Sequence, residues 1–347
     1  MANILDIRRR IRSVTNTRQI TRAMKMVSAA RLRRAQDRAL AARPYAQMLT
    51  NVLKSLVSRV DTHDAETGEP LHPLLVRRPE QNILLIVVTG DKGLAGAFNS
   101  NILKAASRFL DSKAGKNIEI LPIGRKGRDF MRRRFKSAEP RKPDSSAPPQ
   151  TTLIGEYVGV LNKIDYSLAS EISETIVERY THAEIDSVYL VFNEFKSVIA
   201  QRLVVEQILP IEHIGAPEIA EAREMQLEEK QRAIDAAKGT GVALRPADTT
   251  ESDKAAAQFA TAPVDYIYEQ PPRQLFRALL PKYVSIQIFH ALLESVAAEH
   301  AARMTAMESA TNNAGDMIDS LTLSMNRVRQ AKITREIIEI VSGAAAL

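Results

Sequence analysis

Residues 1–43 read MANILDIRRRIRSVTNTRQITRAMKMVSAARLRRAQDRALAAR, and this stretch decides the fold class. It contains no proline, and its apolar residues follow the alternating three–four spacing of a helix seam. The first four of them are Ile4, Ile7, Ile11 and Val14. The spacing predicts a long amphipathic helix over residues 1–60, with Pro44 as a kink or boundary within it.

The same stretch carries a concentrated positive charge. It holds 12 Lys and Arg against 2 Asp and Glu, a net +10, whereas the whole chain of 347 residues has 48 against 41 and a net +7. Three interpretations are open: binding of nucleic-acid phosphates, a solvated helix face, or a helix that runs through a protein tunnel and meets acidic loops. The lack of a helix-turn-helix signature and of aromatic platforms for bases argues against nucleic acid.

The C-terminal end of the chain shows a similar helical pattern. Residues 282–347 contain no proline and two glycines, and a helix of 60 residues is about 90 Å long. Its apolar positions form a stripe too narrow to be buried in an ordinary globule. They include Val284, Ile288, Leu292, Val296, Met304, Met307, Ile318, Leu321, Met325, Val328, Ile333, Ile337 and Ile340. The two terminal segments are therefore predicted to pack as a long antiparallel coiled coil.

Between the two helices, residues 75–214 read as an inserted α/β domain with a Rossmann-like order. Residues 82–89, NILLIVVT, form a continuous apolar run typical of a buried parallel strand. A helix near 99–110 and a strand at 118–123 complete a βαβ unit. A further helix and two strands are expected at 163–180, 187–197 and 202–209. Residues 264–281 are expected to end this domain.

Residues 215–263 differ in composition from the terminal helices and from the α/β domain. Residues 218–238 are rich in Glu, Lys, Arg and Ala with modest helical periodicity, and a Gly-, Thr- and Ser-containing stretch follows them. We interpret the segment as an added charged insert.

Composition and motifs indicate no catalytic, metal or cofactor site. The chain has no Cys, and its six His show no ligand spacing. The longest apolar run, 83–88, is too short to span a bilayer. The glycines of residues 90–96, GDKGLAG, match neither phosphate-loop pattern and are expected to form a tight strand-to-helix turn.

Four stretches resemble the gamma subunit of F-type ATP synthase of the bacterial type. Residues 333–344, ITREIIEIVSGA, are similar to the C-terminal signature of that family. Residues 20–27 (ITRAMKMV), 90–99 (GDKGLAGAFN) and 302–314 (ARMTAMESATNNA) agree with it in order and spacing. The resemblance covers the chain from residue 1 to residue 347.

The resemblance implies a non-catalytic rotor subunit of the central stalk. Such a subunit couples ion flow through the membrane sector to ATP synthesis or hydrolysis, and it regulates the ATPase activity and the ion flow. The implied partners are the alpha and beta subunits, the epsilon subunit and the c-subunit ring, with no nucleic acid and no cofactor. Residues 265–269, DYIYE, match a foot segment near these partners. The residues carried over as coupling contacts are Met24, Arg303, Arg329, Gln330, Thr334, Glu336 and Glu339. The basic face is assigned to Arg9, Arg10, Arg31 and Arg34, and the foot contacts to Tyr266, Tyr268 and Glu269.

Two departures from the family pattern carry expectations of their own. Ala95 stands where many relatives have Cys, and the insert at 215–263 is longer than in simple bacterial relatives and lies where photosynthetic ones carry a regulatory insertion. Without Cys, a dithiol switch is impossible, so the insert is expected to brace the foot or to slow hydrolysis. The family-like helix begins near Met1, which favours a peripheral protein on the cytoplasmic face of a bacterial inner membrane.

Overall fold

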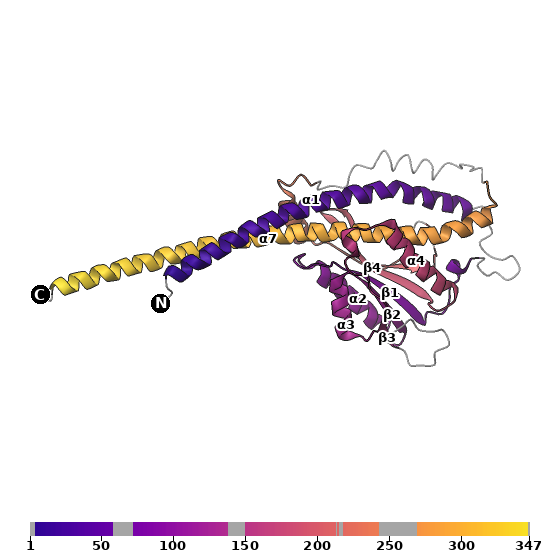
Figure 1. Ribbon diagram of the computed structural model, residues 1–347, viewed down its shortest axis with the longest axis horizontal. Helices are drawn as coiled ribbons and strands as arrows, with labels where there is room; N and C mark the ends of the chain where they lie inside the picture. Colours follow the sequence, from indigo (N-terminus) through magenta and orange to yellow (C-terminus); the bar gives the residue numbers. More distant parts are fainter. Residues whose placement is uncertain are drawn as a thin grey trace.

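Two long helices form the axis of the molecule. The computed structural model describes residues 4–57, 72–137, 150–212, 214, 218–242 and 269–345. The helix α1 spans Ile4–Val57 and α7 spans Pro272–Ala345, and they run side by side in opposite directions beyond the rest of the fold (Figure 1). The predicted antiparallel pair with an inserted α/β domain is confirmed.

Small and apolar side chains hold the two helices together. Ala29 and Leu32 of α1 and Ala298 and Ala301 of α7 are all at most 3% exposed, and small residues let the helix backbones approach closely. The Thr21 and Thr311 hydroxyl oxygens lie 2.7 Å apart, within hydrogen-bond distance. By this register, residues of α7 past about 328 extend beyond the start of α1, as Figure 1 shows.

Both helices continue through prolines that the sequence marks as breaks. Pro44 lies inside α1, and Pro281 lies inside α7, which begins at Pro272 and not at residue 282. A proline is tolerated at the first helical position because its missing N–H has no helical partner there. Around Pro281, the neighbours Leu280 and Val284 are fully buried, so packing outweighs the lost backbone hydrogen bond.

A six-stranded sheet forms the foot, in the order β3-β2-β1-β4-β5-β6. Strands β1 to β4 pair in parallel, and β5 and β6 are added antiparallel. The strands are β1 (Asn82–Val88), β2 (Asn117–Ile123), β3 (Thr151–Leu153), β4 (Ser187–Ser197), β5 (Ala200–Leu209) and β6 (Glu218–Glu224). The four strands expected from the sequence are therefore present, and β1 is buried along nearly its whole length, as its apolar run predicts.

Helices cover both faces of this sheet. They are α2 (Phe98–Ser112), α3 (Arg125–Arg134), α4 (Tyr166–Thr181) and α5 (Leu227–Ala237), with short 3₁₀ turns at Pro73–Leu75 and Val160–Asn162. Alternate residues of β1 enter two different cores: Leu85 lies in one and Ile86 in the other. Each core also contains residues of α1 and of α7, so the foot and the long helices share their buried interior.

Part of the charged segment is a strand, which the sequence does not predict. Residues 218–224 form β6 and pair with β5, and only α5 fits the helical expectation for 218–238. Nearly all side chains of β6 are exposed, so no apolar alternation marks it, and its structure comes from the backbone of β5. The helix α3 and the short strand β3 were also not anticipated.

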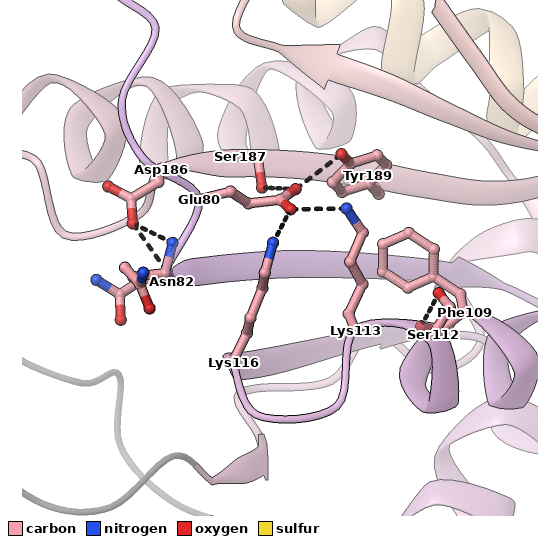
Figure 2. A network of polar contacts seen from close by, with 10 residues as sticks. Glu80, Asn82, Phe109, Ser112, Lys113, Lys116, Asp186, Ser187 and Tyr189 are labelled. Carbon is pink, nitrogen blue, oxygen red and sulfur yellow. Dashed lines mark hydrogen bonds and ion pairs between the residues drawn. The ribbon is translucent and has the colours of Figure 1, made fainter.

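A network of hydrogen bonds and ion pairs lies at the end of the sheet where β1 and β4 begin (Figure 2). The Glu80 carboxylate accepts hydrogen bonds from Lys113 Nζ at 2.6 Å, Tyr189 Oη at 2.8 Å and Ser187 Oγ at 3.0 Å, and also from Lys116. Burial alone would raise the pKa of Glu80, but these donors outweigh it and lower the pKa to about 2. The Glu80 carboxylate thereby joins three segments of the chain: the residues just before β1, the loop between α2 and β2, and the start of β4.

Candidate functional site

The loop between β1 and α2 packs directly against α7. A Cβ atom on Gly90 would lie 2.7 Å from Glu299 Oε1, so any larger residue there would displace the Glu299 carboxylate. Gly90 N–H donates to Asn99 Oδ1 at 2.8 Å, which holds the loop against the start of α2. Leu94 has φ +63° and is 64% exposed, so the loop presents an apolar side chain in a strained backbone conformation.

A buried ion pair on α7 lies beneath this loop. Arg303 is 8% exposed and Glu299 is 6% exposed, and the two are paired one helical turn apart. Arg303 Nη2 also donates to the Gly93 carbonyl at 3.4 Å, and Nη1 donates to His300 Nδ1 at 3.3 Å. Burial, and then the charges of Arg303, Arg31 and Arg34, lower the pKa of His300 to about 4. His300 is therefore uncharged at neutral pH.

These residues line a basic cavity of about 350 Å³ between α1, α7 and the foot. Its charged and titratable lining residues are Arg31, Arg34, Arg38, Asp91, Lys92, Glu299, His300 and Arg303. With His300 neutral, five cations face two carboxylates. We name this the basic cavity; its chemistry suits carboxylate or phosphate groups, which guanidinium side chains bind with paired hydrogen bonds.

Met24 lies further along α1, where the two helices are cross-linked by polar contacts. Its side chain is half-buried, and its carbonyl accepts a hydrogen bond from Ser28 Oγ at 2.8 Å. The neighbouring Lys25 pairs with Glu308 of α7 at 2.8 Å, with both side chains largely shielded from solvent. This region fixes the register of the two helices and leaves part of Met24 accessible.

The remaining predicted coupling residues lie apart from the basic cavity, on the end of α7. Arg329, Gln330, Thr334, Glu336 and Glu339 are all exposed. We call residues 329–345 the tip. Apolar side chains are also exposed on the tip, with Ile333 at 49%, Ile337 at 55% and Ile340 at 71%. The Glu336 and Glu339 carboxylates pair with basic side chains one turn away, at 3.6 and 2.9 Å.

The other predicted contacts lie at the extremes of the molecule. Arg9 and Arg10 are exposed near the start of α1, and Arg9 approaches Asp6 at 3.8 Å. Glu269 is exposed just before α7 begins. Tyr266 and Tyr268 lie outside the described residues.

The sequence alone did not identify several residues that form these surfaces. Glu299 could have been found, because it stands four residues before Arg303 and is of opposite charge. No local signal points to Lys25 and Glu308 as partners, since 283 positions separate them in the chain. The role of Lys92 in the basic cavity depends likewise on how the foot packs against α7.

Within the described residues, no group of His, Asp or Glu side chains is arranged to hold a metal ion. The helices described here include none that is both long and apolar enough to cross a membrane.

Comparison with known proteins assigns the family. The family model of the ATP synthase family, described as "ATP synthase", matches residues 3–347. The chain is 48% identical to the ATP synthase gamma chain of Solibacter usitatus, covering 100% of this chain and 99% of that relative. It is 41% identical to the ATP synthase gamma chain of Chloroherpeton thalassium, with the same coverage. A chain in the structure of Euglena gracilis mitochondrial ATP synthase shares the fold, with a TM-score of 0.52 and 16% identity over 99% of this chain and 94% of that one. The protein thus belongs to the ATP synthase gamma-chain family.

Proposed function

We propose that this gamma chain, a non-catalytic subunit of the central stalk, turns inside the ring of alpha and beta subunits. It would thereby couple ion flow through the c-subunit ring to ATP synthesis and hydrolysis. The observation that carries the proposal is the shared interior of the foot and the long helices. A foot that rotates with the c-ring can turn the helices only if the two move as one body, and continuous close-packed cores transmit strain.

Unequal contacts around the axis supply the coupling. The basic cavity, the half-buried Met24 and the exposed tip lie at different positions along the helix pair. A rotating axis of this kind offers each beta subunit a different set of contacts in turn. Because a conformational equilibrium shifts only by differences in contact free energy, the three catalytic sites would be driven out of phase.

Within this scheme the basic cavity receives acidic loops of the beta subunits. Arg31 and Arg34 are exposed at its rim, and Arg303 is fixed inside it by Glu299. The tip would turn in an apolar sleeve at the far end of the ring. Its exposed isoleucine side chains form no hydrogen bonds that would hold the tip at one angle. The foot would meet the epsilon subunit and the c-ring through a surface that includes Glu269.

The same scheme places the protein peripherally on the cytoplasmic face of a bacterial inner membrane. The foot would lie nearest the lipid, and the helix pair would point away from it.

The charged insert would brace the foot. Its strand β6 extends the sheet, and Arg108 of α2 binds Glu221 of β6 at 2.7 Å. Its helix α5 buries Ala233 and Ala236 in the core that also contains residues of α7. A brace from the sheet to the long helix would limit bending at their junction, and we assign any slowing of hydrolysis by the insert to that restraint.

Substitution at the rim of the basic cavity tests the proposal. Arg31→Gln and Arg34→Gln should each reduce coupled ATP synthesis in inverted membrane vesicles by about tenfold or more. The reason is that a charge-assisted hydrogen bond contributes about 1.5 to 3 kcal/mol. Arg33→Gln is the matched control, because Arg33 is an exposed arginine of the same helix that does not line the cavity. Synthesis that falls equally in all three variants, or in none, would contradict the assignment.

A further inference from the structure

A second cavity, of about 240 Å³, separates the sheet from the long helices, and the rotary scheme does not use it. It is lined from α1, β4, β5, β6 and α7. Its polar lining residues are Thr50, Glu194, Arg202, Glu206, Tyr283, Gln287, His290 and Glu294. We name it the acidic cavity, since three carboxylates and one guanidinium face it.

Glu206 is a carboxylate of the acidic cavity that makes no ion pair with the described residues, whereas Glu194 does. Glu194 of β4 is bound by Arg202 and also approached by Lys196 at 3.5 Å. Arg202 is engaged in that pair and is also under the influence of Glu224 of β6. Glu206 stands on the same face of β5 as Arg202. In the register of the sheet, Arg202 lies opposite Glu194, and Glu206 lies opposite Leu190. Glu294 and His290 of α7 also line the cavity. A carboxylate at this position is therefore buried at the interface with α7 and also feels the like charge of Glu194.

Two observations show that a proton at Glu206 suits the cavity. Burial, and then the charge of Glu194, raise the pKa of Glu206 to about 7, although Arg202 acts in the other direction. The Gln287 side-chain oxygen is buried in α7 without a hydrogen-bond partner among the described residues. A protonated carboxyl brings a donor into the cavity, and a carboxylate brings only acceptors.

We propose that Glu206 and the acidic cavity form a proton-responsive joint between the sheet and α7. With a proton from solvent on Glu206, the carboxyl is neutral, supplies the missing donor, and the sheet and helix stay closely packed. When the proton returns to solvent, the buried carboxylate lacks hydration and is repelled by Glu194, so the joint loosens and admits water. The direction follows from linkage: an acid that holds its proton more tightly in the folded protein stabilises it less as pH rises toward neutrality.

Hydrogen exchange tests the joint in the full-length chain. Protection of amides in residues 200–209 and 283–294, corrected for intrinsic rates, should fall about tenfold between pH 6 and pH 8.5. In Glu206→Gln, which is neutral at both pH values and keeps a donor, protection should change less than twofold. Glu218→Gln, an exposed substitution on the neighbouring strand β6, should behave as the wild type.

A second variant keeps the proposal testable if Glu206→Gln fails to fold. Glu194→Gln frees Arg202 to pair with Glu206, so the loss of protection should move below pH 6. Equal pH dependence in the wild type and in either variant would overturn the joint. Because the measurement concerns the chain itself, its outcome is independent of whether the rim arginines act in rotary coupling.

Discussion

At the scale of single residues, Glu80 shows how one half-buried acid can set the acid limit of the fold. Its pKa is about 2 in the folded protein and about 4.5 in an unfolded chain. A depressed pKa adds stability that is complete above pH 4.5 and is lost as pH falls toward 2. The three segments tied by Glu80 in Figure 2 are therefore expected to separate early in acid.

Glu80→Gln should accordingly lower the free energy of unfolding at pH 7 by about 2 to 3 kcal/mol, with partial solvent screening included. The variant should also lose the part of the pH dependence that lies between pH 4.5 and 2. Urea denaturation at a series of pH values measures both effects. Glu178→Gln, at an exposed glutamate of α4, is the control and should change neither. A variant as stable as the wild type at pH 7 would show that the network contributes nothing.

Residue-level roles could be predicted from the sequence only in part. Arg303 and Met24 were identified through family resemblance. The structure places Met24 next to the Lys25–Glu308 pair that joins α1 and α7, and it places Arg303 in a buried ion pair within α7. Glu206 and Glu80 carry no local signal, because their pKa values depend on neighbours from other strands and helices. Electrostatic environments of this kind arise only from tertiary packing, which a one-dimensional pattern does not contain.

At the scale of elements, the sequence predicts buried strands well and exposed strands poorly. The strand β1 is buried on both faces, so its continuous apolar run identifies it directly. The strand β6 is an exposed edge and its residues are mostly charged, so the same kind of reasoning predicts a helix there. The helices α1 and α7 could be predicted from their apolar stripes, whereas the passage of α7 through Pro281 could not, because it depends on packing in the folded protein.

The helix α5 offers a test of the brace. Ala236 is fully buried in the core that α5 shares with α7. Ala236→Glu would bury an unpaired charge, so α5 should detach at a cost of about 3 kcal/mol or more to local stability. Limited proteolysis and hydrogen exchange of residues 227–242 measure the detachment. Arg232→Glu, at an exposed position of the same helix, should leave exchange near the wild-type rate, and unchanged exchange in Ala236→Glu would refute the docking.

At the scale of the whole molecule, the tip and the foot should be separable in their effects. Residues 329–342 of the tip are exposed and belong to neither core, so removing 333–347 should leave thermal unfolding of the remainder within about 1 °C of the wild type. Coupled ATP synthesis by the assembled complex should nevertheless fall, because contacts at the end of the axis are lost. Calorimetry and a vesicle synthesis assay give the two values. A large drop in thermal stability would mean that the tip supports the fold.

The pairing of the chain's two ends also governs how the protein is made. Thr21 and Thr311, which lie in contact, are 290 positions apart, so α1 leaves the ribosome long before its partner helix exists. At about 5 to 20 residues per second, that delay is on the order of 15 to 60 s. During that time the inner face of α1, with Leu32 and Leu53, has no α7 to cover it. The nascent chain is therefore expected to need a chaperone that shields an amphipathic helix until translation is nearly complete.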